Sequence, residues 1–279
     1  MTEDRPGATR RDFVKTTGGA LAASVVSGPV LAAPAGKRRY AIVGTGIRAT
    51  GMWGRAVAEG YSDVVEFVGL CDPNRKRLEA SKGMMGVSCP GFGDFDEMCD
   101  AAKPELLMVT TVDAHHSEYI GRALDRGIDV ITEKPMVIDA AQCQDVLEAE
   151  KRNDRKIVVT FNYRYAPKHQ RIKEILLAGD IGRVTSVDFS WYLDVYHGAD
   201  YFRRWHRLRS KGGSLWVHKS THHFDLINWW LAQDPVDVST GVGTGGCATS
   251  SSGACRCRTT CSCPARGRER CPASPASPP

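Results

Sequence analysis

Short apolar runs alternate with amphipathic segments through the middle of this 279-residue chain. Segment 117–126 illustrates the amphipathic kind, because Tyr119, Ile120 and Ala123 fall on one face at helical spacing. Strand and helix units repeated in this order predict an α/β fold with a doubly wound parallel sheet. The expected strands are 40–43, 64–71, 106–110, 129–132 and 156–161, and the expected helices are 50–59, 75–81, 95–102, 117–126 and 140–153.

The pattern changes near Asn162, where the regular alternation ends. Segments 168–177 and 222–231 have helical spacing, whereas 184–191 alternates like a half-exposed antiparallel strand. A strand and helices without βαβ repetition predict a smaller α+β domain, following the first α/β domain. The expected domains are 37–161 and 162–239.

Residues 1–35 have the features of a twin-arginine export signal. Arg10 and Arg11 precede Phe13, a weakly apolar run rich in Gly and Ala follows, and small residues at 33–35 suit cleavage. The run is too short and too rich in Gly and Ala for a membrane span. We therefore expect a periplasmic or other extracytoplasmic protein without a membrane anchor.

Residues 240–279 differ sharply in composition from the rest of the chain. They contain no Leu, Ile, Met, Phe, Tyr, Trp or Lys, but hold six of the ten cysteines. Such a segment buries too little apolar surface to offset the entropy of ordering it. A shifted reading frame is the favoured explanation, with natural disorder and a metal or disulfide module as alternatives. We therefore expect the second domain to be incomplete, and a homo-oligomer only if that domain is complete.

The overall charge points to no particular partner. The chain has 37 basic and 32 acidic residues, and much of its net charge of +5 comes from arginines near the two ends. Outside one short stretch, no basic stripe is interleaved with aromatic residues, so we expect no nucleic-acid partner.

The segment from Gly44 to Ala49 lies between an expected strand and an expected helix, where a dinucleotide fingerprint belongs. The first glycine makes the tight turn, and Gly46 allows the backbone to approach a pyrophosphate. Amides at the following helix start would face the phosphates. This context predicts a Rossmann-type nicotinamide site that uses Gly44, Thr45, Gly46, Ile47 and Arg48.

Asp72 ends the next expected strand, 26 residues after Gly46. A carboxylate there suits the hydroxyls of a ribose and favours NAD. Arg75 keeps NADP open, because its guanidinium is positioned to meet a 2′-phosphate. We therefore expect NAD, with NADP as the alternative.

Lys134 follows a buried strand and precedes a helix, which places it at the carboxyl edge of the sheet. Ligands of open α/β sheets bind at that edge. A cation there can hold a substrate hydroxyl and stabilise developing negative charge on its oxygen. Segments 113–116 and 162–165 follow neighbouring strands. The further residues expected near the cofactor are Thr111, His116, Glu133, Asn162 and Arg164.

Segment 212–225 is the richest in chemistry-bearing residues. His218 and His222 are four residues apart and share a face if the segment is helical. Zinc is not favoured, because no further ligand is evident, and we expect no metal. An imidazole can instead take a hydroxyl proton while hydride leaves the same carbon.

Aromatic residues are dense between 191 and 206, interspersed with arginines. Aromatic faces with polar tips suit the C–H faces and hydroxyls of a sugar, and the arginines would equally suit an acidic sugar. An aromatic core or an oligomer interface is the alternative. The residues expected at the substrate are Lys134, Arg164, Tyr165, Trp205 and His222.

The motifs in this order resemble the glucose-fructose oxidoreductase/inositol dehydrogenase/MocA family over about 39–237. They are Gly44-Thr-Gly46, Cys71-Asp72-Pro73, Glu133-Lys134-Pro135, Phe161-Asn162-Tyr-Arg164-Tyr165 and Gly212-Gly-Ser-(x)7-His222-(x)2-Asp225. The resemblance implies an N-terminal Rossmann domain and a C-terminal domain with a mixed sheet. It also implies Lys134 and His222 as catalytic residues and Asn162 and Arg164 near the cofactor. The family commonly has Asp where His218 stands, and Ala49 replaces the usual third glycine.

The resemblance implies hydride transfer between NAD(P) and a sugar, polyol or cyclitol. Export adds the expectation of a tightly held cofactor, because free nicotinamide cofactor is scarce outside the cytoplasm. Two alternatives stay open: an NAD-dependent glycoside hydrolase that works by oxidation and elimination, and a truncated, non-catalytic product that binds only the cofactor.

Overall fold

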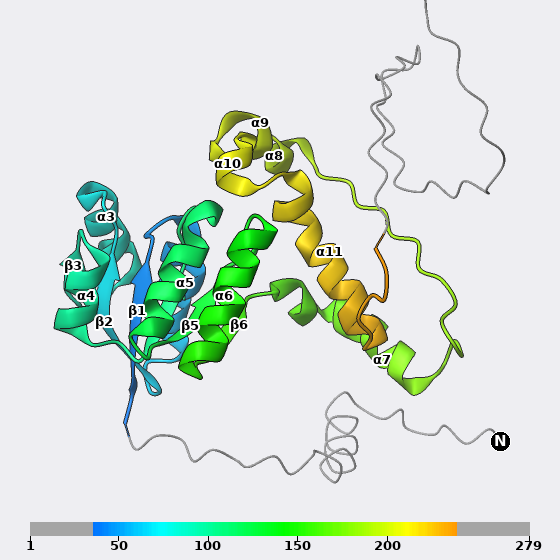
Figure 1. The fold of residues 1–279 in the computed structure, drawn as a ribbon, viewed down its shortest axis with the longest axis horizontal. Helices are drawn as coiled ribbons and strands as arrows, with labels where there is room; N and C mark the ends of the chain where they lie inside the picture. Colours follow the sequence, from blue (N-terminus) through cyan, green and yellow to red (C-terminus); the bar gives the residue numbers. More distant parts are fainter. Residues whose placement is uncertain (1–35, 239–279) are drawn as a thin grey trace, which may run out of the picture.

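The computed structural model describes residues 36–238, so the predicted export signal and the anomalous tail from 240 lie outside the described residues. A six-stranded parallel sheet dominates the first domain, in the order β3-β2-β1-β4-β5-β6 (Figure 1). This confirms the predicted doubly wound α/β fold. The strands are β1 (Arg38–Val43), β2 (Val65–Cys71), β3 (Gly91–Phe92), β4 (Leu106–Val109), β5 (Asp129–Thr132) and β6 (Ile157–Val159).

The central strands are buried on both faces. Leu107 and Val109 of β4 pack into one apolar cluster with helix residues, and Met108 packs into a second cluster on the opposite face. Burial on both sides explains why these strands are apolar at successive positions. The two-residue strand β3 was not predicted, because it is too short to carry a periodic signal.

Helices cover the sheet, and three of them begin at side-chain caps. Asn74, Asp94 and Asp139 each accept a hydrogen bond from a backbone amide of the first turn, as N-cap residues do. The expected helix over 50–59 is instead a π-helical segment followed by a short α-helix. The helical elements of this domain are η1 (Ala49–Arg55), α2 (Ala56–Gly60), α3 (Arg75–Met85), α4 (Phe95–Ala102), η2 (Asp113–His115), α5 (His116–Asp125) and α6 (Ala140–Asn153).

The second region differs from its prediction in one element. The strand expected over 184–191 is extended but pairs with no other strand of the described part. A strand needs a neighbour for its backbone hydrogen bonds, and residues 162–238 provide none. The helical elements of this region are η3 (Asn162–Tyr165), α7 (Pro167–Ala178), α8 (Val195–Gly198), α9 (Asp200–Arg203), η4 (Trp205–Arg207), α10 (Arg209–Gly212) and α11 (Leu215–Leu231).

Helix α11 connects the second region to the sheet edge. It begins after Gly213, whose φ of +72° and close approach to the Ile138 carbonyl leave no room for a larger residue. Ser214 caps the helix through the amide of Val217. Its far end packs against α7, where the indole of Trp230 donates to the carbonyl of His169 (Figure 1). The expected helix over 222–231 is therefore the second half of a longer one.

Across residues 36–238, no helix is long and apolar enough to cross a membrane. The same part of the chain contains no group of three or more His, Cys, Asp or Glu side chains placed to hold a metal ion.

Candidate active site at the carboxyl edge of the sheet

Three neighbouring strands, β1, β4 and β5, end at one edge of the sheet. Gly44 follows β1, Thr110 follows β4, and Glu133 follows β5. The hydroxyl of Thr110 donates to the carbonyl of Gly44 over 2.6 Å and so joins two of these ends. Because β1, β4 and β5 are adjacent and parallel, their carboxyl ends form a single ligand-facing edge.

The glycine turn after β1 has the geometry expected of a phosphate-binding turn. Gly44 has a φ of +86°, and an added Cβ would lie 2.8 Å from backbone atoms of Thr110 and Thr111. A Cβ on Gly46 would instead meet nothing within 4 Å. The first glycine is therefore required by the protein itself, whereas the second faces space that a ligand can use. Residues Ile47 and Arg48 of the turn are exposed.

Asp72 lies at the end of β2 but is turned inward. Its carboxylate accepts hydrogen bonds from the amide and hydroxyl of Thr45, from the amide of Asn74, and from the guanidinium of Arg77. Burial opposes its charge, but these donors outweigh burial and lower its pKa below the usual value. The contact between Asp72 and a cofactor ribose stays a prediction, as does that of Arg75, which is exposed on α3.

Glu133 joins the glycine turn to the end of β5. Its buried carboxylate accepts hydrogen bonds from Arg48 and, over 2.8 Å, from the indole of Trp53. Two residues expected at the cofactor, Arg48 and Glu133, are thus in direct contact. The pair fixes the residue that precedes Lys134 in the chain.

Lys134 is held by α11. Its ammonium group lies 3.1 Å from Nε2 of His218 and donates over 2.9 Å to the carbonyl of the same residue. Burial lowers the pKa of Lys134 to about 8, while the nearby carboxylates of Asp113 and Glu133 oppose that shift. The lysine is therefore a cation at neutral pH whose proton is more easily given up than that of a surface lysine.

His218 stands between Lys134 and Asp113. Its Nδ1 lies 2.5 Å from the carboxylate of Asp113, which is only 3% exposed. Burial lowers the pKa of His218 to about 3 and raises the pKa of Asp113 to about 6. At neutral pH the imidazole is accordingly neutral and the carboxylate is ionised.

His222 lies one turn further along α11 and is 4% exposed. Its ring stacks on that of Tyr163 at a centroid distance of 3.9 Å, and its Nδ1 has no hydrogen-bond partner among the described residues. Burial, followed by the charges of Lys134 and Lys219, lowers the pKa of His222 to about 2. The imidazole is therefore neutral at neutral pH, which is the protonation state that a general base needs.

The remaining predicted residues differ in their contacts and in their burial. Arg164 is at this edge but pairs with the buried carboxylate of Asp225 on α11. His116 is buried and lies 2.8 Å from the Pro135 carbonyl, so it supports the loop that carries Lys134. Tyr165, in contrast, is 75% exposed and contacts none of the groups described above. Thr111 and Asn162 lie at the strand ends, half-buried.

Three site residues were not predicted as such: Asp113, Tyr163 and Tyr201. Asp113 lies in a segment that the sequence marks as a strand end, but its contact with His218 joins positions 105 residues apart in the chain. The hydroxyl of Tyr163 accepts from Lys219 over 2.8 Å, and the ring of Tyr201 lies 5.5 Å from that of His218. Such contacts depend on how α11 docks, which residue spacing does not encode.

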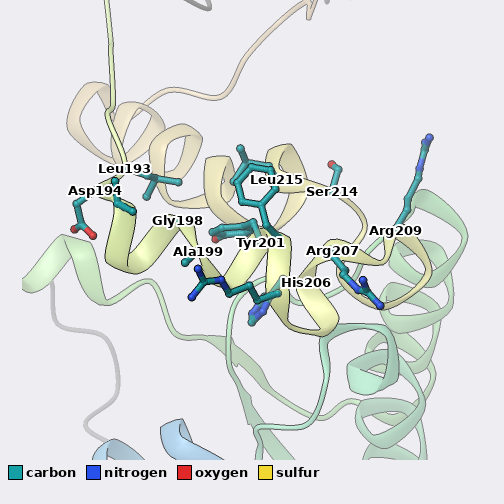
Figure 2. Close-up of a pocket in the computed structure, with 13 residues that line it drawn as sticks. Leu193, Asp194, Gly198, Ala199, Tyr201, His206, Arg207, Arg209, Ser214 and Leu215 are labelled. Carbon is teal, nitrogen blue, oxygen red and sulfur yellow. The ribbon is translucent and has the colours of Figure 1, made fainter. Parts of the chain in front are cut away.

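A hollow of about 840 Å³ opens beside His218, between residues 193 and 215. Tyr201 and His206 line it, and the ring of His206 lies 4.7 Å from that of His218 (Figure 2). The predicted substrate residue Trp205 stacks on His206 at 3.7 Å. Residues that line the hollow therefore lie next to His218, the residue that holds Lys134.

Comparison with family models matches two parts of the chain. Residues 38–161 match the model described as "Oxidoreductase family, NAD-binding Rossmann fold". Residues 173–244 match that described as "Oxidoreductase family, C-terminal alpha/beta domain". Both models belong to the same family, and together they cover most of the chain.

Two curated relatives agree with this assignment. The putative oxidoreductase YteT of Bacillus subtilis is 48% identical over 199 residues, which is 70% of this chain and 46% of the relative. Inositol 2-dehydrogenase of Salmonella typhimurium is 27% identical over 171 residues, or 61% of this chain and 48% of that protein. The chain thus spans about half the length of the curated relatives it matches.

Solved structures share the fold. Myo-inositol 2-dehydrogenase from Lactobacillus plantarum aligns with a TM-score of 0.59 and 24% identity, over 72% of this chain and 58% of that one. Scyllo-inositol dehydrogenase from Lactobacillus casei, solved with NAD(H) and scyllo-inositol, aligns with a TM-score of 0.58 and 21% identity, over 71% of this chain and 57% of that one.

Proposed function

Because the chain belongs to the glucose-fructose oxidoreductase/inositol dehydrogenase/MocA oxidoreductase family, we propose that it transfers hydride between NAD and a CH–OH carbon of a sugar, polyol or cyclitol. The observation that carries the proposal is Lys134, a half-buried cation held by His218 at the ligand-facing edge of a Rossmann sheet. A cation held there with a lowered pKa fits an acid–base step on a hydroxyl group.

The residues of the first domain fit a dinucleotide. The turn at Gly44, the open space at Gly46 and the start of η1 suit a pyrophosphate, and the Arg48–Glu133 pair lies between this turn and Lys134. When bound, the nicotinamide accepts or donates the hydride. NADP is the second candidate, because Arg77 neutralises the buried carboxylate of Asp72 and Arg75 is exposed next to it.

Lys134 and His222 have different roles at the substrate hydroxyl group. The ammonium of Lys134 donates to the substrate oxygen and stabilises the negative charge that develops there. His222, which is neutral at neutral pH, accepts the hydroxyl proton.

The hollow beside His218 is the proposed place for the rest of the substrate. Its lining combines the aromatic ring of Tyr201 and the imidazole of His206 with apolar side chains, the carboxylate of Asp194 and three arginines (Figure 2). Aromatic and apolar walls suit the C–H faces of a sugar or cyclitol ring, and the polar tips suit its hydroxyls.

The proposal is tested by mixing the purified chain with NAD and a panel of inositols, polyols and sugars, and following the absorbance of reduced nicotinamide. We expect reduction with at least one compound. Lys134→Ala should lose turnover while its affinity for NAD, measured by fluorescence titration, stays the same. Lys151→Ala is the matched control, because Lys151 is exposed on α6. Equal turnover in Lys134→Ala and the control would remove the assignment.

We further propose that the protein is exported and keeps its cofactor bound. Support comes from Arg10, Arg11 and the apolar run behind them. Twin-arginine export moves folded proteins, so a cofactor loaded in the cytoplasm can travel with the chain. Fractionation of the native host tests this: we expect periplasmic protein that releases a dinucleotide on denaturation. Cytoplasmic protein, or periplasmic protein without dinucleotide, would contradict it.

A further inference from the structure

Asp113 is the buried end of a chain of hydrogen bonds that leads to Lys134. It begins η2, just beyond β4, and its carboxylate lies 2.5 Å from Nδ1 of His218. The other ring nitrogen of His218 lies 3.1 Å from the ammonium of Lys134. One imidazole thus contacts a carboxylate on one side and an ammonium on the other.

The two contacts select the same tautomer of His218. An ammonium group has donors only, so Nε2 of His218 must be an acceptor, and the ring proton then resides on Nδ1. With its proton on Nδ1, the imidazole donates a hydrogen bond to the ionised carboxylate of Asp113. The carboxylate therefore holds the imidazole in the form that presents a lone pair to Lys134.

Asp113 makes no other side-chain hydrogen bond within the described residues, and its partner there, His218, is a neutral imidazole. A buried carboxylate with a single partner is costly to a fold, so its packing is not explained by stability.

We propose that Asp113 is a positioning residue that acts through His218 to aim and charge the ammonium of Lys134. This inference rests on the proposed dehydrogenase function and names a residue that the sequence motifs of the family do not include. Asp113 touches neither cofactor nor substrate in this scheme. Its effect on the position of the ammonium reaches the reaction through the imidazole, whereas its charge also acts on Lys134 through space.

Several other ionisable groups face the hydrogen bonds between Asp113, His218 and Lys134 and affect the pKa values of these residues. Burial raises the pKa of Asp113, and its negative charge in turn opposes the lowering of the pKa of Lys134. Loss of that charge would therefore lower the pKa of Lys134 further. The surrounding groups are Arg48, His116, Glu133, His197, Tyr201, His206 and Lys219.

The first test is a double-mutant cycle between Asp113→Asn and His218→Ala, with turnover and NAD affinity measured for each variant. We expect Asp113→Asn alone to reduce kcat by roughly 10- to 100-fold, as a misplaced catalytic group does, with NAD affinity unchanged. Its pH–rate limb for Lys134 should move to lower pH. At a pH below the pKa of Lys134, the same substitution should have little further effect on kcat in the His218→Ala background. Equal losses in both backgrounds would overturn the proposal.

Asp145→Asn on α6 is the matched control for the loss of one carboxylate, because Asp145 is exposed. It should leave kcat and the pH–rate profile unchanged. If Asp113→Asn shows the same profile as this control, Asp113 has no positioning role.

The second test does not depend on turnover, and so separates this inference from the proposed function. Imidazole nitrogen chemical shifts identify the tautomer of His218 in the wild-type chain. We expect a proton on Nδ1 in the wild type and a change of tautomer population in Asp113→Asn. A wild-type chain with the proton on Nε2 would overturn the inference even if Asp113→Asn fails to fold. Absence of turnover with an Nδ1 proton would count against the proposed function alone.

Discussion

Gly44 and Gly46 should respond differently to the same small change, because only one of them is required by the protein itself. In Gly44→Ala the new Cβ would lie 2.8 Å from three backbone atoms of Thr110 and Thr111, which no rotamer change can relieve. The backbone φ of +86° adds a penalty for any L-residue. Overpacking of this kind and the left-handed backbone together should cost about 2–4 kcal/mol of unfolding free energy.

Gly46→Ala meets no atom within 4 Å, so its unfolding free energy should stay within about 0.5 kcal/mol of wild type. Its methyl group would instead occupy the space assigned to the pyrophosphate. We therefore expect NAD affinity to fall by about tenfold or more, which corresponds to about 1.4 kcal/mol.

The assay is urea unfolding without ligand, followed by fluorescence titration with NAD for each variant. Gly121→Ala on α5 is a helical control with open space around the position, and it should stabilise the chain by roughly 0.5–1 kcal/mol. The reasoning is refuted if Gly44→Ala unfolds at the wild-type urea concentration. It is refuted equally if Gly46→Ala binds NAD as tightly as wild type.

Three further outcomes are expected. Turnover that needs the Lys134 ammonium should fall as pH rises through about 8, and a rate that keeps rising above this pH would exclude the protonated lysine. His222→Phe should keep the stacking on Tyr163 but abolish turnover. Because burial lowers the pKa values of His222 and His218 to about 2 and 3, the unfolding free energy of the wild type should be complete above pH 6.5 and fall on acidification. Urea unfolding at several pH values should show a shallower fall in His222→Phe. Arg164→Gln should cost about 1–3 kcal/mol in the same assay, because it leaves the carboxylate of Asp225 buried without its cation; an unchanged midpoint would show that the pair contributes nothing.

The first domain was predictable because its signals are local. Apolar strands such as β4 are buried on both faces, and helix starts such as Asp94 satisfy amides within their own first turn. The positions of Gly44 and Lys134 follow from strand order alone, since the carboxyl ends of adjacent parallel strands meet at one edge. These inferences required no knowledge of long-range packing.

The rest depends on contacts between distant parts of the chain. The alternation over 184–191 predicts a strand, but no partner strand is present in the described part, so the segment stays unpaired. Asp72 has the position of a ribose ligand, yet Arg77 and Thr45 occupy its oxygens. The relation of Asp113 to Lys134 exists only because α11 brings His218 between them.

Transfer of deuterium from a CH–OH carbon to the dinucleotide tests whether the chain catalyses hydride transfer. The purified chain is incubated with polyols, inositols and sugars deuterated at their CH–OH carbons, and the dinucleotide released on denaturation is examined by mass spectrometry. A chain that works through Lys134 and His222 beside a bound nicotinamide should yield dinucleotide carrying deuterium, and Lys134→Ala should yield dinucleotide without it. Bound dinucleotide that gains no deuterium from any compound would contradict the account.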